Sequence, residues 1–378
     1  MIPKNIAEEF FQCNKCGLCA ATCPIGKELL LEKYTPRGKI QLARYYSQGE
    51  LDLSDHCREV FAKCLLCGAC ATTCPSGVEL NKVFISLREE ITKNIGVHPM
   101  MGKVVESLVV HHNISNEDNS ERGEWKDFLK NLPPHGYQKS KAEVVYFVGC
   151  VASFFPMVQK IPQQFVQILQ RANVDFTLLG GEEWCCGFPL IGAGAFEKSH
   201  DLIKHNLGKI KELGANRVVF SCPSCYRTWK EHYNADVEIL HSTQLIQKLI
   251  EEGAIRLGKV NTTVTYHDPC DLGRNAGVYD APRQIIKFIP GLTLVELESN
   301  RAQSICCGGG GNLEMADANL SGILAQKKIE EIQRTGAKTV VTSCQQCVRT
   351  IKSRAIRQET NLSVWDITEL VLKAMSPA

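Results

Sequence analysis

The sequence predicts an α+β protein of several domains, in which a helical N-terminal domain precedes two repeated α/β units built on mainly parallel sheets. Three observations support this fold class. The chain of 378 residues is long enough for two or three hydrophobic cores. Its first part repeats a compact cysteine motif, and its remainder contains a tandem repeat of apolar, β-branched runs followed by helical segments.

The composition excludes several classes of protein. Hydrophobic residues make up 44% of the chain and charged residues 22%, as in ordinary globular proteins, and the net charge of +2 offers no basic surface to nucleic acid. The first residues, MIPKNIAEEFFQCNKCG, carry acids and cysteines where a signal peptide needs an apolar core, and no run of about 18 apolar residues occurs. We therefore expect a cytoplasmic chain that does not span a bilayer, and that a partner can hold at the inner face of the membrane.

The chain contains 19 cysteines, which is an unusual number for its length. Secreted disulfide scaffolds are small and carry an even number of cysteines, whereas this chain is large and shows no export signal. We therefore interpret most of the cysteines as metal ligands in a reducing compartment, and their spacing tests this interpretation.

The first eighty residues contain the motif C-x₂-C-x₂-C-x₃-C-P twice, as CNKCGLCAATCP and CLLCGACATTCP. Bacterial ferredoxins hold two [4Fe–4S] cubanes with this spacing. Three thiolates on a tight loop cover three corners of one cube, and the fourth cysteine, which we expect to start a helix, reaches the other cluster. Zinc sites, the main alternative, usually pair two C-x₂-C knuckles and do not require crossed ligands. The predicted ligands of the first cubane are Cys13, Cys16, Cys19 and Cys74, and those of the second are Cys64, Cys67, Cys70 and Cys23.

The segments around these motifs predict a mainly helical N-terminal domain. The segment TPRGKIQLARYYSQG suits a short helix with Pro36 near its start and Gly49 at its end. Residues 81–94 repeat apolar side chains with helical spacing and predict a second helix that covers the domain.

A polar segment at 112–123, followed by two prolines and a glycine, predicts a domain boundary. We therefore divide the chain into a helical domain at 1–95, a linker with connecting helices at 96–141, and α/β units at 142–258 and 259–378. Each of the two units contains one copy of the tandem repeat.

The tandem repeat is visible in the sequence itself. GANRVVFSCPSCYRT at 214–228 and GAKTVVTSCQQCVRT at 336–350 are identical at nine of fifteen positions, with an offset of 122 residues. The preceding cysteines repeat with offsets of 120 and 121 residues. Each copy contains a lone cysteine, then Cys-Cys-Gly, then C-x₂-C, and the lone cysteine and the C-x₂-C pair each follow an apolar, β-branched run.

Each copy therefore offers five thiols. Loops at the carboxyl ends of parallel strands gather at one edge of a sheet, so we expect the five thiols of a copy to meet at one point. The residues alone leave open a four-ligand cluster with a spare thiol, a structural zinc, or a redox disulfide. Cys57 lies outside all these sets and is expected to be a partly buried structural cysteine. The first copy supplies Cys150, Cys185, Cys186, Cys222 and Cys225, and the second supplies Cys270, Cys306, Cys307, Cys344 and Cys347.

On these motifs the chain resembles the cysteine-rich CCG superfamily, which includes heterodisulfide reductases and the iron–sulfur subunits of glycolate, lactate and glycerol-3-phosphate dehydrogenases. A ferredoxin-type domain followed by two CCG domains is the layout of the D-type heterodisulfide reductase polypeptide, which is equivalent to a fusion of the C-type and B-type polypeptides. The segments YHDPCDLGRNAGVYDAPR at 266–283 and CCGGGGN at 306–312 are similar to that branch. The resemblance implies a noncubane [4Fe–4S] cluster in each complete five-cysteine set, with zinc as the alternative in one of them.

The resemblance implies an oxidoreductase subunit that passes electrons between the two cubanes and the CCG clusters, and that can reduce a disulfide. The alternative is an iron–sulfur wire of an FAD-linked glycolate- or lactate-type dehydrogenase that delivers electrons to a quinone. A zinc or scaffold protein is a third reading, which the crossed cysteine motifs disfavour.

No flavin or nucleotide site is expected in this chain, because GGGG at 308–311 lacks the G-x-G-x-x-G context. A chain without its own two-electron donor site must receive electrons from a partner. We therefore expect a hetero-oligomer with a flavoprotein or another electron-donor subunit, and with a membrane cytochrome or quinone-reactive subunit as a further partner.

Several single residues are candidates for roles at these sites. His267 is a catalytic candidate that could carry a proton to a leaving thiolate, or else orient its loop. Arg227 and Arg349 follow the two C-x₂-C pairs, where they could balance cluster charge or remain solvated. Trp184 precedes the first Cys-Cys pair and is expected to shield a cluster or fill the core.

The four glycines after Cys307 suggest how the two copies differ. Glycine lets the backbone approach a cluster closely and turn its N–H groups toward sulfur. The first copy continues as CCGFP, so we expect the second cysteine pair to be the more open one, where an exogenous sulfur or a partner would approach.

Overall fold

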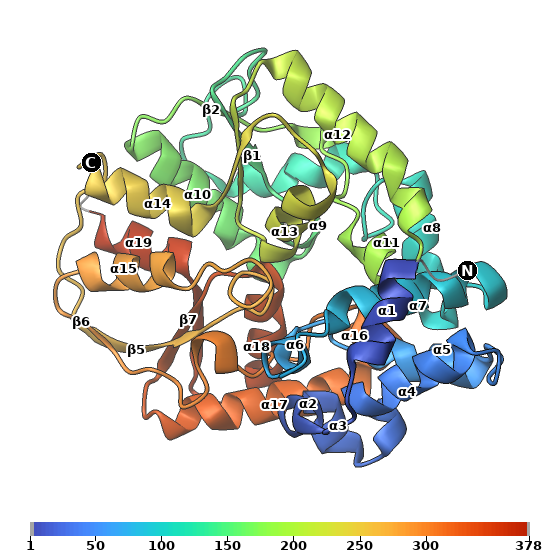
Figure 1. The fold of residues 1–378 in the computed structure, drawn as a ribbon. Coiled ribbons are helices and arrows are strands. Elements are labelled where there is room, and N and C mark those ends of the chain that lie inside the picture. Colours follow the sequence, from blue (N-terminus) through green and yellow to red (C-terminus); the bar gives the residue numbers. More distant parts are fainter. Residues whose placement is uncertain (1–3, 376–378) are drawn as a thin grey trace.

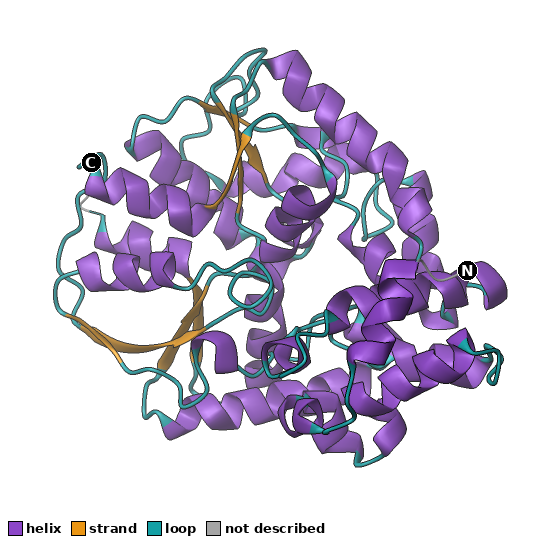
Figure 2. Cartoon of the chain, in the orientation of Figure 1, coloured by secondary structure: helices purple, strands orange, loops and turns teal. Residues whose placement is uncertain are grey.

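The predicted α+β fold class is confirmed by a computed structural model, which describes residues 4–375. A helical N-terminal part lies against two α/β units, each with a four-stranded sheet (Figures 1 and 2). The N-terminal part contains α1 (Lys4–Gln12), α2 (Leu18–Thr22), α3 (Pro24–Leu29), α4 (Pro36–Ser47), α5 (Asp55–Ala62), α6 (Ala69–Thr72), α7 (Leu80–Ile95) and α8 (Gly102–Val110), followed by the 3₁₀ segment η3 (Asn119–Phe128).

Both helices predicted in the N-terminal domain are present. α4 begins at Pro36 because Thr35 caps it, the Thr35 hydroxyl accepting a hydrogen bond from the backbone N–H of Gly38 at 3.0 Å. α7 covers residues 81–94 and buries Val83 and Leu87 in the core of the domain.

The two crossing cysteines differ in their local structure. Cys23 caps α3, and its sulfur accepts from the N–H of Gly26 at 3.4 Å, so the predicted helix start is confirmed there. The same prediction is wrong for Cys74. Its carbonyl oxygen accepts from the N–H of Gly77 in a turn, and the next helix begins only at Leu80. The shared C-P motif therefore does not fix the conformation that follows it.

The two α/β units have the same topology, as the repeat predicts. All strands are parallel, in the orders β2-β1-β3-β4 and β6-β5-β7-β8. The first unit contains β1 (Val144–Phe147), α9 (Cys150–Phe154), α10 (Lys160–Arg171), β2 (Phe176–Thr177), α11 (Phe188–Gly192), α12 (His200–Leu213), β3 (Arg217–Phe220), α13 (Pro223–His232), β4 (Glu238–His241) and α14 (Ser242–Glu251). The second contains β5 (Thr262–His267), α15 (Asp280–Phe288), β6 (Leu292–Leu294), α16 (Leu313–Ala316), α17 (Ala318–Arg334), β7 (Thr339–Thr342), α18 (Gln345–Arg357), β8 (Ser363–Asp366) and α19 (Ile367–Ala374).

The two sheets are separated by a layer of four helices. α10 packs against α19 and α14 packs against α15, and Figure 1 shows these helices between the sheets. The central core includes Tyr146 of β1 and Tyr266 of β5, at equivalent places. The Tyr146 hydroxyl shares a hydrogen bond with Ser221 at 2.6 Å, and the Tyr266 hydroxyl donates to Ser343 at 3.1 Å. The two units therefore share equivalent strands and also equivalent side-chain hydrogen bonds in the core.

Residues 96–141 are not an extended connector. They contain α8 and η3, and η3 packs against α9 and the loop before Glu183 in the first unit. The division of the chain at 1–95, 96–141, 142–258 and 259–378 stays a prediction.

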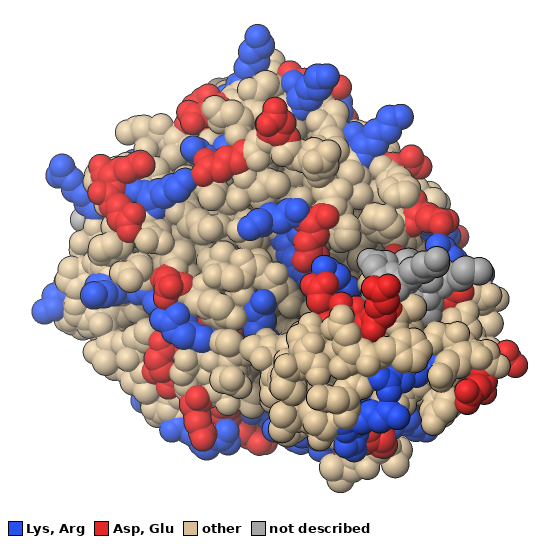
Figure 3. Space-filling view, viewed as in Figure 1, with Lys and Arg blue, Asp and Glu red and all other residues tan. Residues whose placement is uncertain are grey.

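The surface carries no large area of one charge on the side shown in Figure 3, where acidic and basic side chains are mixed. Within residues 4–375, no helix is both long enough and apolar enough to cross a bilayer.

The stability of the second unit should depend on pH through Asp366, at the end of β8. This buried carboxylate caps α19, accepting from Thr368 N–H at 2.9 Å, and burial raises its pKa to about 7. Between about pH 4 and pH 7 the native state therefore holds a proton that the unfolded state releases, so the free energy of unfolding falls as pH rises through this window.

Replacing the carboxyl group tests this dependence. Asp366→Asn retains the cap but cannot ionise, so urea unfolding under anaerobic conditions should show it more stable than the wild type at pH 8 but not at pH 5. The exposed Asp236→Asn is the matched control. Equal pH profiles for the wild type and Asp366→Asn would contradict the assignment.

Candidate functional site

The eight N-terminal cysteines gather in two groups with the crossed membership that the motif predicts. Each group lines its own small pocket, and all 19 cysteines of the chain are free thiols. The loops turn at Gly17 and Gly68, where φ angles of 84° and 75° favour glycine. The first pocket is lined by Cys13, Cys16, Cys19 and Cys74, and the second by Cys23, Cys64, Cys67 and Cys70.

Two buried cations lie beside the second pocket. Lys39 is 1% exposed and donates to the carbonyl oxygen of Lys63, and Arg88 is 4% exposed and donates to the carbonyl oxygen of Cys64, both at 2.7 Å. Burial lowers the pKa of both side chains. Within residues 4–375 neither cation pairs with a carboxylate, and an anionic metal–thiolate group would supply the missing negative charge. The environment therefore fits an iron–sulfur cluster.

The cysteines of the two α/β units surround one shared cavity of about 400 Å³. Nine of the ten line its wall, and the tenth, Cys306, is 2% exposed beside Cys307. Six of the thiols reach the cavity because they follow the carboxyl ends of β1, β3, β5 and β7, and the two adjacent cysteine pairs lie in the segments that follow β2 and β6. The sequence predicts a meeting point within each copy, and it does not predict that the two points share one cavity.

The five thiols of each copy are neighbours in the same order. Cys307 Sγ lies 3.3 Å from Cys347 Sγ, and the neighbouring Cys185 thiol, together with burial, raises the pKa of Cys150 well above its ordinary value. Such thiols keep their protons unless a metal cation replaces them. The order is Cys150, Cys185, Cys186, Cys225 and Cys222 in the first copy, and Cys270, Cys306, Cys307, Cys347 and Cys344 in the second.

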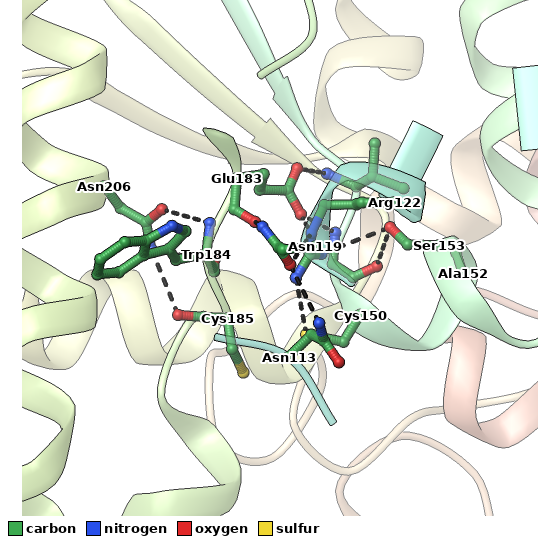
Figure 4. Close-up of polar contacts among 12 residues, drawn as sticks. Asn113, Asn119, Arg122, Cys150, Ala152, Ser153, Glu183, Trp184, Cys185 and Asn206 are labelled. Carbon is green, nitrogen blue, oxygen red and sulfur yellow. Dashed lines mark hydrogen bonds and ion pairs between the residues drawn. The ribbon is translucent and has the colours of Figure 1, made fainter. Parts of the chain in front are cut away.

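A buried arginine reaches the lone cysteine of the first copy (Figure 4). Arg122 of η3 is 1% exposed and donates to Cys150 Sγ at 3.3 Å and to Glu183 Oε1 at 2.9 Å. Glu183 is held in turn by the backbone N–H groups of Val148 and Gly149, at 2.7 and 2.8 Å. The ion pair thus places a positive charge against one sulfur of the site.

Nothing in the local sequence indicates this role of Arg122. It lies in the segment 112–123, whose polar residues suggest a solvated boundary. Asn113 is nevertheless fully buried, and the side-chain amide of Asn119 donates to the carbonyl oxygen of Glu183 at 3.0 Å. These polar residues therefore serve a buried network.

The N-terminal domain meets the second copy at the cysteine loops themselves. Arg274 Nε donates to the carbonyl oxygen of Cys67 at 2.8 Å. Burial alone would lower the pKa of Arg274, but the adjacent sulfurs of Cys67 and Cys270, which favour a positive charge when they are deprotonated, raise it. A Cβ on Gly311 would lie 2.4 Å from the carbonyl carbon of Leu65, so glycine is required for this approach.

The prediction that the second cysteine pair is more open is wrong. Cys306 and Cys307 are each 2% exposed, and Cys185 and Cys186 are 2% and 3% exposed. Gly308 and Gly311 are buried because α17 and the Cys64–Cys67 loop pack against them, whereas Gly309 and Gly310 are half-buried and line the cavity. At Gly308 and Gly311 glycine permits close contact between parts of the chain, and the cysteine pair beside them is no more exposed than the pair in the first copy.

His267 is buried at the thiols of the second copy. It is fully buried, neither ring nitrogen has a hydrogen-bond partner among the described residues, and burial lowers its pKa well below the ordinary value. One ring nitrogen and the sulfurs of Cys307 and Cys347 lie within 4.8 Å of one another. The structure therefore brings this predicted residue to the site.

The other single residues have partners that the sequence does not show. Arg227 pairs with Asp271 at 3.1 Å, and Arg349 pairs with Glu314 and lies over a ring at the cavity wall. Both arginines therefore form ion pairs with acidic side chains, which the interpretation as solvated residues does not include.

Trp184 and Cys57 lie outside the cavity. Trp184 stacks between His112 and His205, with ring centroids 3.5 and 3.7 Å apart. Cys57 is 5% exposed in α5, where its thiol accepts from the Ser54 hydroxyl at 3.5 Å, in agreement with a structural role.

Comparison with known proteins identifies both kinds of domain. Residues 9–78 match the 4Fe-4S dicluster domain, and residues 144–230 and 264–352 match the cysteine-rich domain CCG. The chain therefore binds iron–sulfur clusters.

Relatives with similar sequences are oxidoreductase subunits. The D-type polypeptide of the dihydromethanophenazine:CoB–CoM heterodisulfide reductase from Methanosarcina barkeri is 30% identical, over 97% of this chain and 94% of its own length. The EtfAB:quinone oxidoreductase of Syntrophomonas wolfei is 28% identical, over 84% of this chain and 47% of its own length. A hypothetical protein from Helicobacter pylori has a crystal structure that matches with a TM-score of 0.56 at 11% identity, covering 90% of this chain and 67% of that one, which supports the fold alone.

The buried Arg122–Glu183 pair yields a prediction for stability. Arg122→Met leaves a buried carboxylate without its cation and should lower the free energy of unfolding by about 3–5 kcal/mol in urea titrations. The double variant Arg122→Met with Glu183→Gln removes both charges and should recover much of that loss. Equal destabilisation of the single and double variants would contradict the ion-pair explanation.

Proposed function

Since the chain belongs to the D-type heterodisulfide reductase family of iron–sulfur proteins, we propose that it reduces a disulfide between two noncubane [4Fe–4S] clusters that receive electrons from two cubanes. At the coarser level, it is an iron–sulfur electron-transfer subunit of a heterodisulfide-reductase-like oxidoreductase. The observation that carries the finer proposal is the single cavity lined by thiols of both copies.

The proposed ligands follow the observed groups of thiols. The lining of the two N-terminal pockets supports the cubane sets, and the repeated order of neighbouring thiols supports the noncubane sets. We propose Cys13, Cys16, Cys19 and Cys74 for the first cubane, Cys23, Cys64, Cys67 and Cys70 for the second, and the five cysteines of each copy for the noncubane clusters.

A noncubane cluster supplies single electrons and an iron that can bind a substrate sulfur. The cysteines of both copies line one cavity, and this supports two such sites that would each face one sulfur of a disulfide. Phe155 and Phe188 line the cavity and help to exclude water. The reaction is RSSR′ + 2e⁻ + 2H⁺ → RSH + R′SH, in which the S–S bond breaks and the partner donor is oxidised.

The contacts between domains support an electron route through the second copy. Arg274 hydrogen-bonds the loop of Cys67 and lies beside the thiolate of Cys270. We therefore propose that electrons pass from the first cubane to the second and then to the second CCG site. The donor is a flavoprotein or another donor subunit of a hetero-oligomer, and a membrane cytochrome or quinone-reactive partner would hold the complex at the inner face of the membrane.

The alternative proposal is an iron–sulfur wire. The similarity to an EtfAB:quinone oxidoreductase supports it, since that relative is named for a quinone. In this case the chain belongs to an FAD-linked glycolate- or lactate-type complex, and its cavity binds no disulfide.

Metal content tests the cluster assignment. Four [4Fe–4S] clusters predict about sixteen irons and as many sulfides in the anaerobically purified chain. Cys225→Ser should lose about four irons with the first CCG cluster, whereas the matched control Cys57→Ser should retain all of them. About eight irons together with zinc would contradict the two noncubane sites.

Thiol binding and turnover separate the two proposed functions. With a chemically reduced viologen as donor, the chain should release 2-mercaptoethanol from bis(2-hydroxyethyl) disulfide, and the free thiol should produce a new paramagnetic signal in the oxidised protein. Cys347→Ser should abolish both while leaving the cubanes reducible. A fully loaded wild-type protein that shows neither effect but reduces a quinone with its flavoprotein partner would establish the wire.

A further inference from the structure

The two CCG sites carry different side chains at the strand residue that lies three positions before the lone cysteine of each copy. Phe147 pairs with Phe220 across β1 and β3, and His267 pairs with Thr342 at the same register across β5 and β7. The repeat therefore places an imidazole in the second copy where the first has a phenyl ring. The strand register establishes this equivalence independently of the sequence offset.

The phenyl ring of the first copy needs no polar partner. Phe147 packs against Phe220 and Trp229, with ring centroids 5.4 and 5.6 Å apart. In the second copy the corresponding neighbours are Thr342 and Ile351, neither of which is aromatic, so the aromatic cluster of the first copy has no counterpart here. The Thr342 hydroxyl donates to the backbone carbonyl oxygen of His267 at 3.0 Å and does not reach the ring.

The imidazole is buried without a partner from the described part of the chain. His267 is fully buried and both of its ring nitrogens lack hydrogen bonds. A buried polar group without a partner typically costs about 1–3 kcal/mol, so such a residue in a native structure requires an explanation. Its ring approaches the sulfurs of Cys307 and Cys347, and one nitrogen with these two sulfurs forms a group compact enough to share a metal ion.

We propose that His267 contacts the metal group of the second CCG site directly through a ring nitrogen, so that this site is thiolate–imidazole while the first is all-thiolate. The inference rests on the proposed function, because it assumes that the second set of cysteines binds a metal group. Imidazole nitrogens are common metal ligands, and the position of the ring against two of the proposed ligand sulfurs suits such a contact.

The contact has a direct electronic consequence. A neutral imidazole that would take the place of a thiolate on iron, or an N–H that would donate to a cluster sulfur, lowers the negative charge at the cluster and raises its reduction potential. Removing the imidazole should therefore lower the potential of one cluster and leave the other three unchanged.

The test uses the whole chain loaded with clusters and labelled with ¹⁵N-histidine. Hyperfine spectroscopy should detect a ¹⁵N coupling on one paramagnetic cluster, and His267→Phe, which copies the first site, should lose it. Potentiometric titration of the same variant should show a downward shift of one midpoint potential. His241→Asn is the matched control, since His241 is equally buried at the end of β4, where its Nδ1 accepts from Thr243 N–H and caps α14.

The outcomes separate this inference from the proposed function. A wild-type protein with about sixteen irons and no ¹⁵N coupling would overturn the inference about His267 and leave the proposed function standing. This result does not depend on whether His267→Phe binds iron. About eight irons with bound zinc would overturn the proposed function. X-ray absorption spectroscopy at the zinc edge would then test the contact of His267 with the metal. An imidazole ligand that is present in the wild type and absent in His267→Phe would support the contact, and a zinc ion with sulfur ligands only would refute it.

Discussion

A single guanidinium group joins the three parts of the molecule that carry cysteines. Arg88 of α7 donates to the carbonyl oxygen of Cys64 in its own domain, to Gly192 of the first unit and to Gly311 of the second. The group is 4% exposed and has no carboxylate partner among the described residues, and a cation buried in this way is unfavourable unless negative charge lies nearby. Thiolates bound to metal provide such charge, so cluster binding and the assembly of the three parts stabilise each other.

The same electrostatic requirement recurs at the other sites. Lys39 lies beside the second N-terminal pocket, Arg122 contacts Cys150, and Arg274 lies beside the thiolate of Cys270. These cations come from different elements, and the positions of Arg122 and Arg274 are not related by the repeat. The two copies therefore hold equivalent sets of thiols in unequal electrostatic surroundings, and their clusters need not share one reduction potential.

Local chemistry explains which features could be predicted from the sequence. The strands and the helices after them follow from local residue patterns, and the grouping of thiols within each copy follows from the repeat, because loops at the carboxyl ends of parallel strands meet at one edge of a sheet. The shared cavity and the role of Arg122 depend on how separate units pack, and no short pattern encodes that packing. The prediction of a helix directly after Cys74 is wrong for a similar reason. The Cys-Pro dipeptide is followed by a helix at Cys23 but by a turn at Cys74, so the dipeptide alone does not decide the conformation.

The four glycines show how one sequence signal supports two different physical readings. Glycine can leave space beside a cluster, or it can let another backbone take that space. Gly308 matches Gly187, and both have φ angles near 90°, at 97° and 91°. The copies diverge immediately afterwards, where Phe188 begins α11 in the first and glycines continue in the second. A Cβ at Gly311 would collide with the backbone of the Cys64–Cys67 loop, so the glycine-rich copy can receive this cysteine loop, whereas the first copy meets the N-terminal domain at α7. The sequence difference therefore marks where a cysteine loop of the N-terminal domain meets the second copy, which supports the electron route that we propose, and the burial of Cys306 and Cys307 is consistent with the same contact.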